Sequence, residues 1–192
     1  LFHTDAVQWF GKLPLVGVAD FHADLVSLCA HKFHGPKGAG LLYAKSPLNP
    51  DPILHGGAHE NERRAGTENL PAILGLADAI VQFVPSPVFP MAQLGGWSNL
   101  LIDSVDSIEG ASFIGDRAPN GRLQNTVSFI VEDSDSIALL SGLDLEGVCA
   151  SSGSACSSGS VTPSHVVKAL GAPDSAANAL VRLSLGRETS LE

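Results

Sequence analysis

Charge is scarce in this chain and is mostly of one sign. Asp, Glu, Lys and Arg make up 16% of the 192 residues, below the roughly 25% of typical soluble domains. The 20 acidic residues outnumber the 11 basic ones, for a net charge of −9. This balance excludes a protein that wraps nucleic acid, which needs clustered Lys and Arg. A small anionic ligand is not excluded, because local groups decide its binding.

Long apolar runs and a cysteine framework are also missing. No apolar run approaches the ~20 residues of a membrane-spanning helix, and no secretory signal opens the chain, so we expect no membrane partner. The cysteines, Cys29, Cys149 and Cys156, are too few and too unevenly spaced for a disulfide framework, and no CxxC pair predicts a zinc site. We therefore expect a reducing, cytoplasmic location.

What the chain does have is apolar sequence, 44% of its residues, which predicts a buried core. Apolar runs alternate with helical stretches, which predicts an α/β fold. Strands are expected at residues 1–4, 24–29, 40–44, 124–131 and 179–185, and helices at 69–83, 91–105, 136–144 and 164–170. The Pro-rich segment 84–90 (VPSPVFP) predicts a boundary between one domain at 1–84 and another at 85–192.

A lysine lies in the first segment that departs from an ordinary domain, residues 27–40 (SLCAHKFHGPKGAG). His31 and Lys32 follow a predicted strand and precede a turn whose glycines allow close backbone approach to a ligand. A lysine beside apolar residues at a strand end is placed for desolvation, which lowers its pKa and frees the amine as a nucleophile. From this spacing alone, a surface lysine in a Gly/Pro turn is the alternative.

A cysteine lies in the second such segment, residues 151–160 (SSGSACSSGS). Because its neighbours are all small, we expect Cys156 to be an exposed thiol that can attack as a thiolate. A flexible linker with an incidental cysteine is the alternative.

Basic residues mark two further places. Arg63, Arg64 and Thr67 lie with several glycines before a predicted helix start, which predicts an anion site. A helix cap beside two solvated arginines is the alternative. Arg182 interrupts an apolar strand, so its charge needs a partner or a carboxylate ligand.

Seven runs, taken together and in this order, resemble those of the cysteine desulfurases, pyridoxal-phosphate (PLP) enzymes of the class V aminotransferase group. The runs are HTDAVQ, SLCAHKFHGPKGAG, GGAHENERRAGTEN, QNTVSF, LDLEGVCASSGSACSSG, PSHVVKALG and RLSLGR. The small-residue segment resembles the branch with a long catalytic loop, which serves iron–sulfur assembly. The resemblance implies the PLP-dependent transferase fold type I. It implies part of the large domain, with a mixed, mostly parallel sheet, at 1–84, and a small C-terminal α+β domain carrying the cysteine loop at 85–192.

The resemblance also implies which residues carry the chemistry. Lys32 matches the lysine that binds the cofactor covalently and moves protons, and Cys156 matches the nucleophile that becomes a persulfide. Asp5 matches the acid that pairs with the pyridine nitrogen, which keeps the ring an electron sink. Gln8 matches the residue that hydrogen-bonds the phenolic oxygen of the cofactor.

The remaining matches concern the phosphate and the substrate. His31 matches a phosphate ligand, whereas Cys29 stands where the family usually has a phosphate-binding Ser. Because a thiol is a poorer donor, we expect Cys29 to pack instead. Thr67 matches the hydroxyl that reaches the phosphate of the partner subunit, which implies a homodimer. Arg182 matches the arginine that binds the substrate carboxylate in a bidentate fork.

The implied reaction converts L-cysteine to L-alanine and leaves a persulfide on Cys156, for a sulfur-acceptor or iron–sulfur scaffold protein. The motifs of the family's N-terminal half are not matched: the Gly-rich phosphate turn, the ring that stacks on the cofactor and an Asn near the substrate. We therefore expect a truncated chain that is incomplete as an enzyme by itself. The alternatives are a selenocysteine lyase, a class V aminotransferase, which needs no loop cysteine, or an inactive fragment serving as an interaction module.

Overall fold

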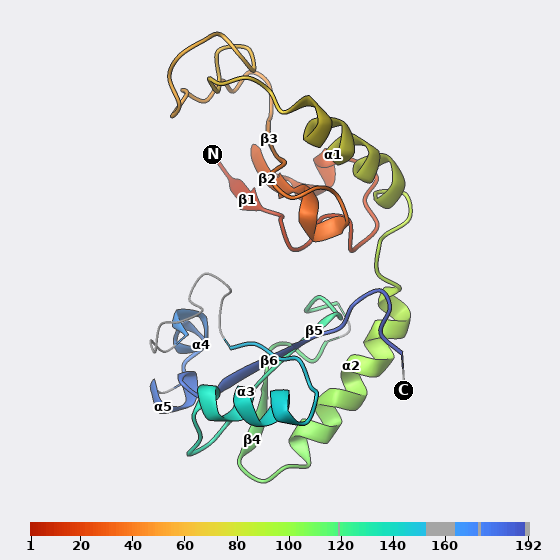
Figure 1. Ribbon diagram of the computed structural model, residues 1–192, viewed down its shortest axis with the longest axis vertical. Coiled ribbons are helices and arrows are strands. Elements are labelled where there is room, and N and C mark those ends of the chain that lie inside the picture. Colours follow the sequence, from red (N-terminus) through yellow and green to blue (C-terminus); the bar gives the residue numbers. More distant parts are fainter. Residues whose placement is uncertain (119, 153–163, 173, 191–192) are drawn as a thin grey trace. The chain divides into compact units, whose positions relative to one another are not determined.

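The computed structural model describes residues 1–118, 120–152, 164–172 and 174–190 (Figure 1). The chain forms two compact units, Leu1–Phe89 and Pro90–Glu192, called here the first and second unit. Their limit falls inside the predicted Pro-rich boundary segment. The assignment of the units to a large and a small domain stays a prediction. In the described residues, no helix combines the length and the apolar character needed to cross a membrane.

The first unit is built on a mixed three-stranded sheet. Its strands are β1 (His3–Asp5), β2 (Leu25–Cys29) and β3 (Gly40–Ala44), in the order β1-β2-β3, and a 3₁₀ turn, η1 (Val18–Phe21), precedes β2. β1 runs parallel to β2, with Asp5 opposite Ser27. β3 runs antiparallel to β2, with Gly40 opposite Cys29. The predicted strands are confirmed, β3 with its predicted bounds and the other two within two residues at each end.

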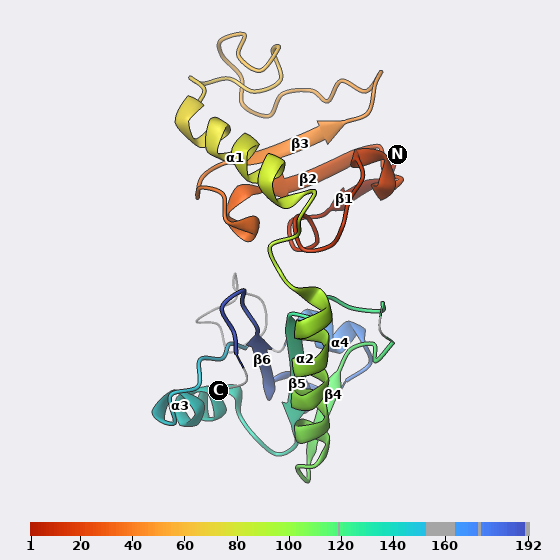
Figure 2. The same cartoon turned by 90° about the vertical axis from the view of Figure 1, so that its right-hand side faces the viewer.

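One face of this sheet is buried. Val26 and Leu28 of β2 lie in the same cluster of buried side chains as Leu76 and Ala79 of helix α1 (Leu70–Phe83), which covers that face (Figure 2). Asn69 begins the helix, because its Oδ1 accepts a hydrogen bond from the N–H of Ala72 at 3.4 Å. Since side chains alternate along a strand, the other face of the sheet carries both polar and apolar side chains, among them Asp5, Ser27 and the exposed Leu42.

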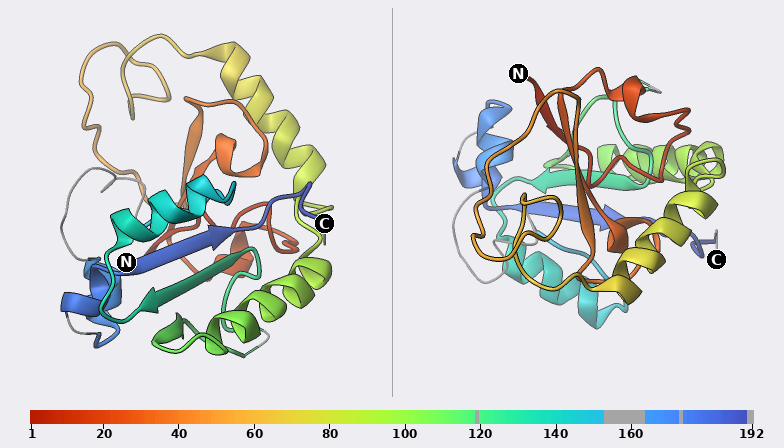
Figure 3. Two further views of the ribbon diagram at one scale, coloured as in Figure 1. Left: turned by 60° about the horizontal axis from the view of Figure 1, so that its bottom comes forward. Right: turned by 90° about the horizontal axis from the view of Figure 1, so that it is seen from above.

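The second unit holds an antiparallel sheet of order β4-β5-β6. Its elements are α2 (Met91–Asp106), β4 (Ala111–Ile114), β5 (Thr126–Val131), α3 (Ser136–Leu145), α4 (His165–Ala169), α5 (Asp174–Ala177) and β6 (Leu180–Ser184). α2 contacts β4 and β5, and α3 contacts β6 (Figure 3). A buried cluster joins Ile130 and Leu180 of the sheet to Val167 of α4. The predicted elements of this unit are confirmed, but β4 and α5 were not predicted.

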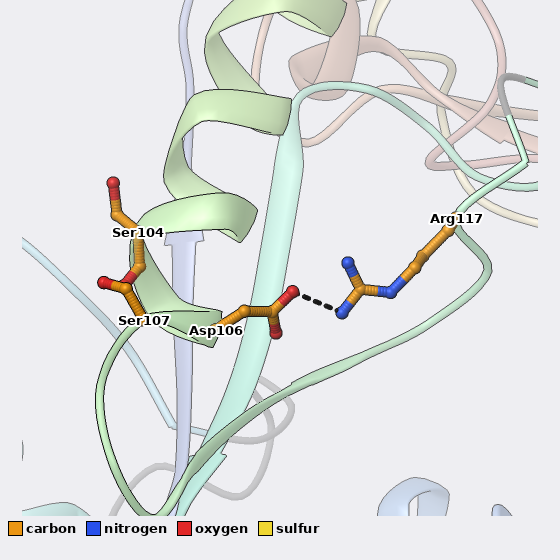
Figure 4. A network of polar contacts seen from close by, with 4 residues as sticks. All are labelled: Ser104, Asp106, Ser107 and Arg117. Carbon is orange, nitrogen blue, oxygen red and sulfur yellow. Dashed lines mark hydrogen bonds and ion pairs between the residues drawn. The ribbon is translucent and has the colours of Figure 1, made fainter.

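An ion pair lies at the C-terminal end of α2. Arg117 NH2 lies 2.6 Å from Oδ2 of Asp106, the last residue of the helix (Figure 4). Both side chains are well exposed, 56% for Arg117 and 36% for Asp106. A carboxylate at a helix C-terminus is unfavourable, because the helix dipole places partial negative charge there. The arginine therefore offsets a local repulsion rather than adding to the stability of the unit.

We expect Asp106→Asn to change the free energy of unfolding by no more than about 0.5 kcal/mol, because an exposed ion pair is screened by water and its loss removes the dipole repulsion as well. Chemical denaturation of the variant and the wild type measures this. Asp103→Asn, on the same helix and exposed, is the matched control. A loss above about 1 kcal/mol confined to Asp106→Asn would contradict the expectation.

Candidate active site

Two neighbouring strands of the first unit end together. Because β1 and β2 are parallel and Asp5 lies opposite Ser27, Asp5 and Cys29 both lie at the carboxyl edge of the sheet. Asp5, Ser27 and Cys29 also share the face opposite the buried Val26. The Oδ1 atom of Asp5 accepts the N–H of Val7 at 2.9 Å, which holds the carboxylate there. Carboxyl ends of parallel strands are where α/β folds bind ligands.

Lys32 lies on a single 3₁₀ turn, η2 (Ala30–Phe33), directly after β2. Ala30 and Phe33 are fully buried, and the Phe33 ring packs edge-on against Phe10 with centroids 5.1 Å apart. Gly35 closes the turn: its N–H donates to the carbonyl of Ala30 at 2.9 Å, and a Cβ there would lie 2.7 Å from the Ala30 Cβ. Buried neighbours therefore hold Lys32, itself half-buried, at the strand end.

A second lysine lies close to the first. Lys12 is 4% exposed, and its Nζ donates a hydrogen bond to Oε1 of Gln8 at 2.6 Å. Burial, and then the positive charge of Lys32, lower the pKa of Lys12 from 10.5 to about 8, while Cys29 acts in the opposite direction. These interactions place Gln8, Lys12, Cys29 and Lys32 in one neighbourhood at the carboxyl edge of the sheet.

Cys29 and His31 are also in contact, with 4.0 Å between the cysteine Sγ and the histidine Nε2. The Cys29 thiol is free and half-buried, and it lies outside the buried cluster of the unit. Strand alternation turns Cys29 away from the face of β2 that carries the buried Val26 and Leu28. The expectation that Cys29 packs rather than binds phosphate stays a prediction.

Thr67 lies on the long loop between β3 and α1 (Figures 1 and 3). Its side chain is exposed, and within the described chain no hydrogen bond joins it to Lys32 or His31. The two arginines before it make local contacts: Arg63 Nε donates to Asn49 Oδ1 at 2.8 Å, and Arg64 NH1 donates to the carbonyl of Ala65 at 2.9 Å. The anion site expected on this loop stays a prediction.

The other predicted site residues belong to the second unit. Arg182 lies in β6 opposite Ser128, and its backbone also pairs with Ser151, whose carbonyl accepts the Arg182 N–H at 2.6 Å. The Arg182 side chain is half-buried next to the fully buried Val181. Cys156 lies outside the described residues.

A comparison with protein families covers the entire chain: the model of aminotransferase class-V matches residues 1–192. The chain belongs to the aminotransferase class-V family. This outcome confirms the family resemblance that the seven sequence runs predicted.

Several relatives of this class-V chain carry the name cysteine desulfurase. The cysteine desulfurase of Rhodobacter capsulatus is 42% identical over 193 residues, which cover 99% of this chain and 49% of the relative. The cysteine desulfurase NifS of Azotobacter vinelandii is 40% identical over 193 residues, which cover 100% of this chain and 47% of the relative. The chain thus spans about half the length of the curated relatives it matches.

A comparison with solved structures finds the same kind of protein. The NifS-like protein of Rickettsia africae is 27% identical, with a TM-score of 0.83 over 98% of this class-V chain and 49% of that one. The predicted α/β fold of this enzyme group is thereby confirmed.

One residue of the neighbourhood, Lys12, was not predicted from the sequence. Its local sequence, WFGKLPL, looks like an apolar segment interrupted by one solvated lysine. The available signal was its spacing of four residues from Gln8, close enough in the chain for the two side chains to meet within one turn.

Proposed function

We propose that this protein is a PLP-dependent cysteine desulfurase, acting on L-cysteine in the cytoplasm. The observation that carries the proposal is the position of Lys32 directly after β2, with Asp5 at the end of the adjacent parallel strand. The names of the relatives support the same activity. Because the chain spans about half of their length, the activity belongs to this proposal rather than to the family assignment.

The residues at the carboxyl edge fit an anionic cofactor that carries a ring nitrogen. Lys12 and Lys32 supply ammonium groups, and Lys12 has no carboxylate partner among the described residues, so positive charge is left unbalanced there. Asp5 supplies a carboxylate on the same sheet edge, and Gln8 supplies an amide. Pyridoxal phosphate bound at this edge supplies an electron sink that makes the Cα–H of an attached amino acid acidic.

Each residue of the first unit has a separate task in this proposal. The Lys32 amine binds the cofactor covalently and then carries the Cα proton. The Asp5 carboxylate keeps a proton on the pyridine nitrogen, and the Gln8 amide donates to the phenolic oxygen. His31 and Cys29 face the phosphate. Thr67, exposed on its loop, reaches the phosphate bound by a second subunit, so the protein would act as a homodimer.

The second unit supplies substrate binding and the nucleophile. The Arg182 guanidinium pairs with the carboxylate of L-cysteine. Cys156 takes the sulfur as a thiolate, so that L-cysteine and the Cys156 thiol become L-alanine and a Cys156 persulfide. A sulfur-acceptor or iron–sulfur scaffold protein then removes the outer sulfur.

Borohydride trapping tests the central claim. The purified protein is incubated with pyridoxal phosphate, reduced with sodium borohydride and digested, and the peptides are mapped by mass spectrometry. We expect the reduced cofactor on the peptide that contains Lys32, because reduction makes the lysine–cofactor bond permanent.

Two arginine variants make the test specific. Lys32→Arg is expected to remove the label, since a guanidinium does not form this bond. Lys37→Arg, on an exposed lysine five residues further along, is expected to keep it. A label spread over several lysines, or no label at all, would overturn the proposed function.

A further inference from the structure

We propose that Lys12 is a positioning residue of the cofactor site: its buried ammonium group fixes the side-chain amide of Gln8, so that Gln8 presents its N–H donors to an anionic oxygen of the ligand. The proposal deepens the proposed function and rests on it for the nature of that oxygen, the ring phenolate of the cofactor. Nothing in the family resemblance assigned a role to Lys12.

The direction of the hydrogen bond carries the argument. Lysine has three donors and no acceptor, so the Gln8 atom that lies 2.6 Å from Nζ is its carbonyl oxygen. The amide can then present only its NH₂ group at its exposed end. A free glutamine would present oxygen or nitrogen with similar ease, and an oxygen facing an anionic ligand would repel it.

The backbone brings the two side chains together. The N–H of Phe10 donates to the carbonyl of Ala6 at 2.8 Å, and the N–H of Lys12 donates to the carbonyl of Trp9 at 3.1 Å. The chain turns back on itself here, with Gly11 at φ +72°, and the 2.6 Å hydrogen bond from Lys12 Nζ to Gln8 Oε1 shows that the two side chains meet in this turn. Gln8 therefore needs no displacement to reach the ammonium group.

Burial of Lys12 indicates a role other than stability. Its Nζ lies 5.6 Å from the centroid of the Phe89 ring, and no carboxylate pairs with it within the described chain. A buried cation without a counter-ion is unfavourable, because its ammonium group loses its hydration. A lysine exposed to water at this point would avoid that cost in free energy. The groups that act on the ammonium are Gln8, Lys32 and Cys29. All three belong to the proposed cofactor site, so the positive charge of Lys12 acts on that site.

The first test needs no cofactor. In protein labelled with ¹⁵N at glutamine side chains, the NMR signal of the Gln8 amide is followed from pH 6 to pH 10. We expect it to move with a midpoint near pH 8, where the ammonium of Lys12 releases its proton. The same titration of Lys12→Met is expected to be flat, and that of Lys37→Met, with an exposed lysine removed, unchanged. A flat titration of the wild type overturns the proposal.

The second test measures whether Lys12 acts through Gln8. Dissociation constants for pyridoxal phosphate are measured for the wild type, Lys12→Met, Gln8→Leu and the double variant. We expect Lys12→Met to weaken binding by about 5- to 10-fold in the wild type and to change nothing further in the Gln8→Leu protein. Equal losses in both backgrounds overturn the proposal, because Lys12 would then act without Gln8.

The two tests separate this proposal from the proposed function. A wild type that does not bind pyridoxal phosphate, yet titrates at Gln8 as described, overturns the cofactor assignment and with it the phenolate as the ligand of Gln8. A wild type that binds the cofactor but shows additive losses leaves the proposed function standing and overturns the role of Lys12.

Discussion

Replacing Cys156 with serine is expected to lower sulfide release from L-cysteine by about 10³-fold or more while leaving covalent cofactor binding at Lys32 intact. A cysteine thiol has a pKa near 8.5, so a useful fraction is thiolate at neutral pH, whereas a serine hydroxyl stays protonated. Serine also cannot hold the transferred sulfur as a persulfide. The assay is sulfide formation in the presence of a reductant, with borohydride trapping in parallel.

Cys149→Ser is the matched control for this prediction. Cys149 is a free, exposed cysteine seven residues earlier in the chain and has no assigned role, so its replacement is expected to change the rate less than about 2-fold. A Cys156→Ser protein that keeps more than about a tenth of the sulfide release would contradict the assignment of Cys156 as the nucleophile, whereas a protein that transfers the amino group and releases no sulfide would favour the aminotransferase alternative, which needs no loop cysteine.

Gly11→Ala is expected to destabilise the first unit by about 2–5 kcal/mol, a large part of the 5–15 kcal/mol that stabilises a typical domain. Gly11 has φ of +72°, where an alanine is strained by about 1–2 kcal/mol. A Cβ at this position would also lie 2.5 Å from the Cβ of Phe33, so the buried turn next to Lys32 has to shift. Chemical denaturation of the protein gives the loss directly.

Two other glycines separate these causes. Gly38 has φ of +86° but nothing within 4 Å of an added Cβ, so Gly38→Ala measures backbone strain alone, about 1–2 kcal/mol. Gly17 is extended, at φ −171°, and also open, so Gly17→Ala is expected to be neutral. If Gly11→Ala lowers the free energy of unfolding no more than Gly38→Ala does, the close approach of Gly11 to Phe33 does not constrain the turn.

Most regular elements could be predicted, because their signals are local. β3 is itself a short apolar run that begins at a glycine. α1 begins at an asparagine cap and has a proline in its first turn. β4 was missed because its four residues, ASFI, show no clear alternation, and it is a strand through its pairing with β5. α5 is a single turn, too short for any periodicity to show.

The sequence by itself determined the family and the identity of the candidate residues, because motifs such as SLCAHKFHGPKGAG are read in order along one chain. Tertiary structure decided which of these residues meet. The parallel pairing of β1 and β2 joins Asp5 to the end of β2, across more than 20 residues of sequence. It also decided that Lys12 is buried, because Phe89, distant in sequence, lies against its ammonium group. Burial is set by what packs around a side chain from elsewhere in the chain, and no local pattern records that.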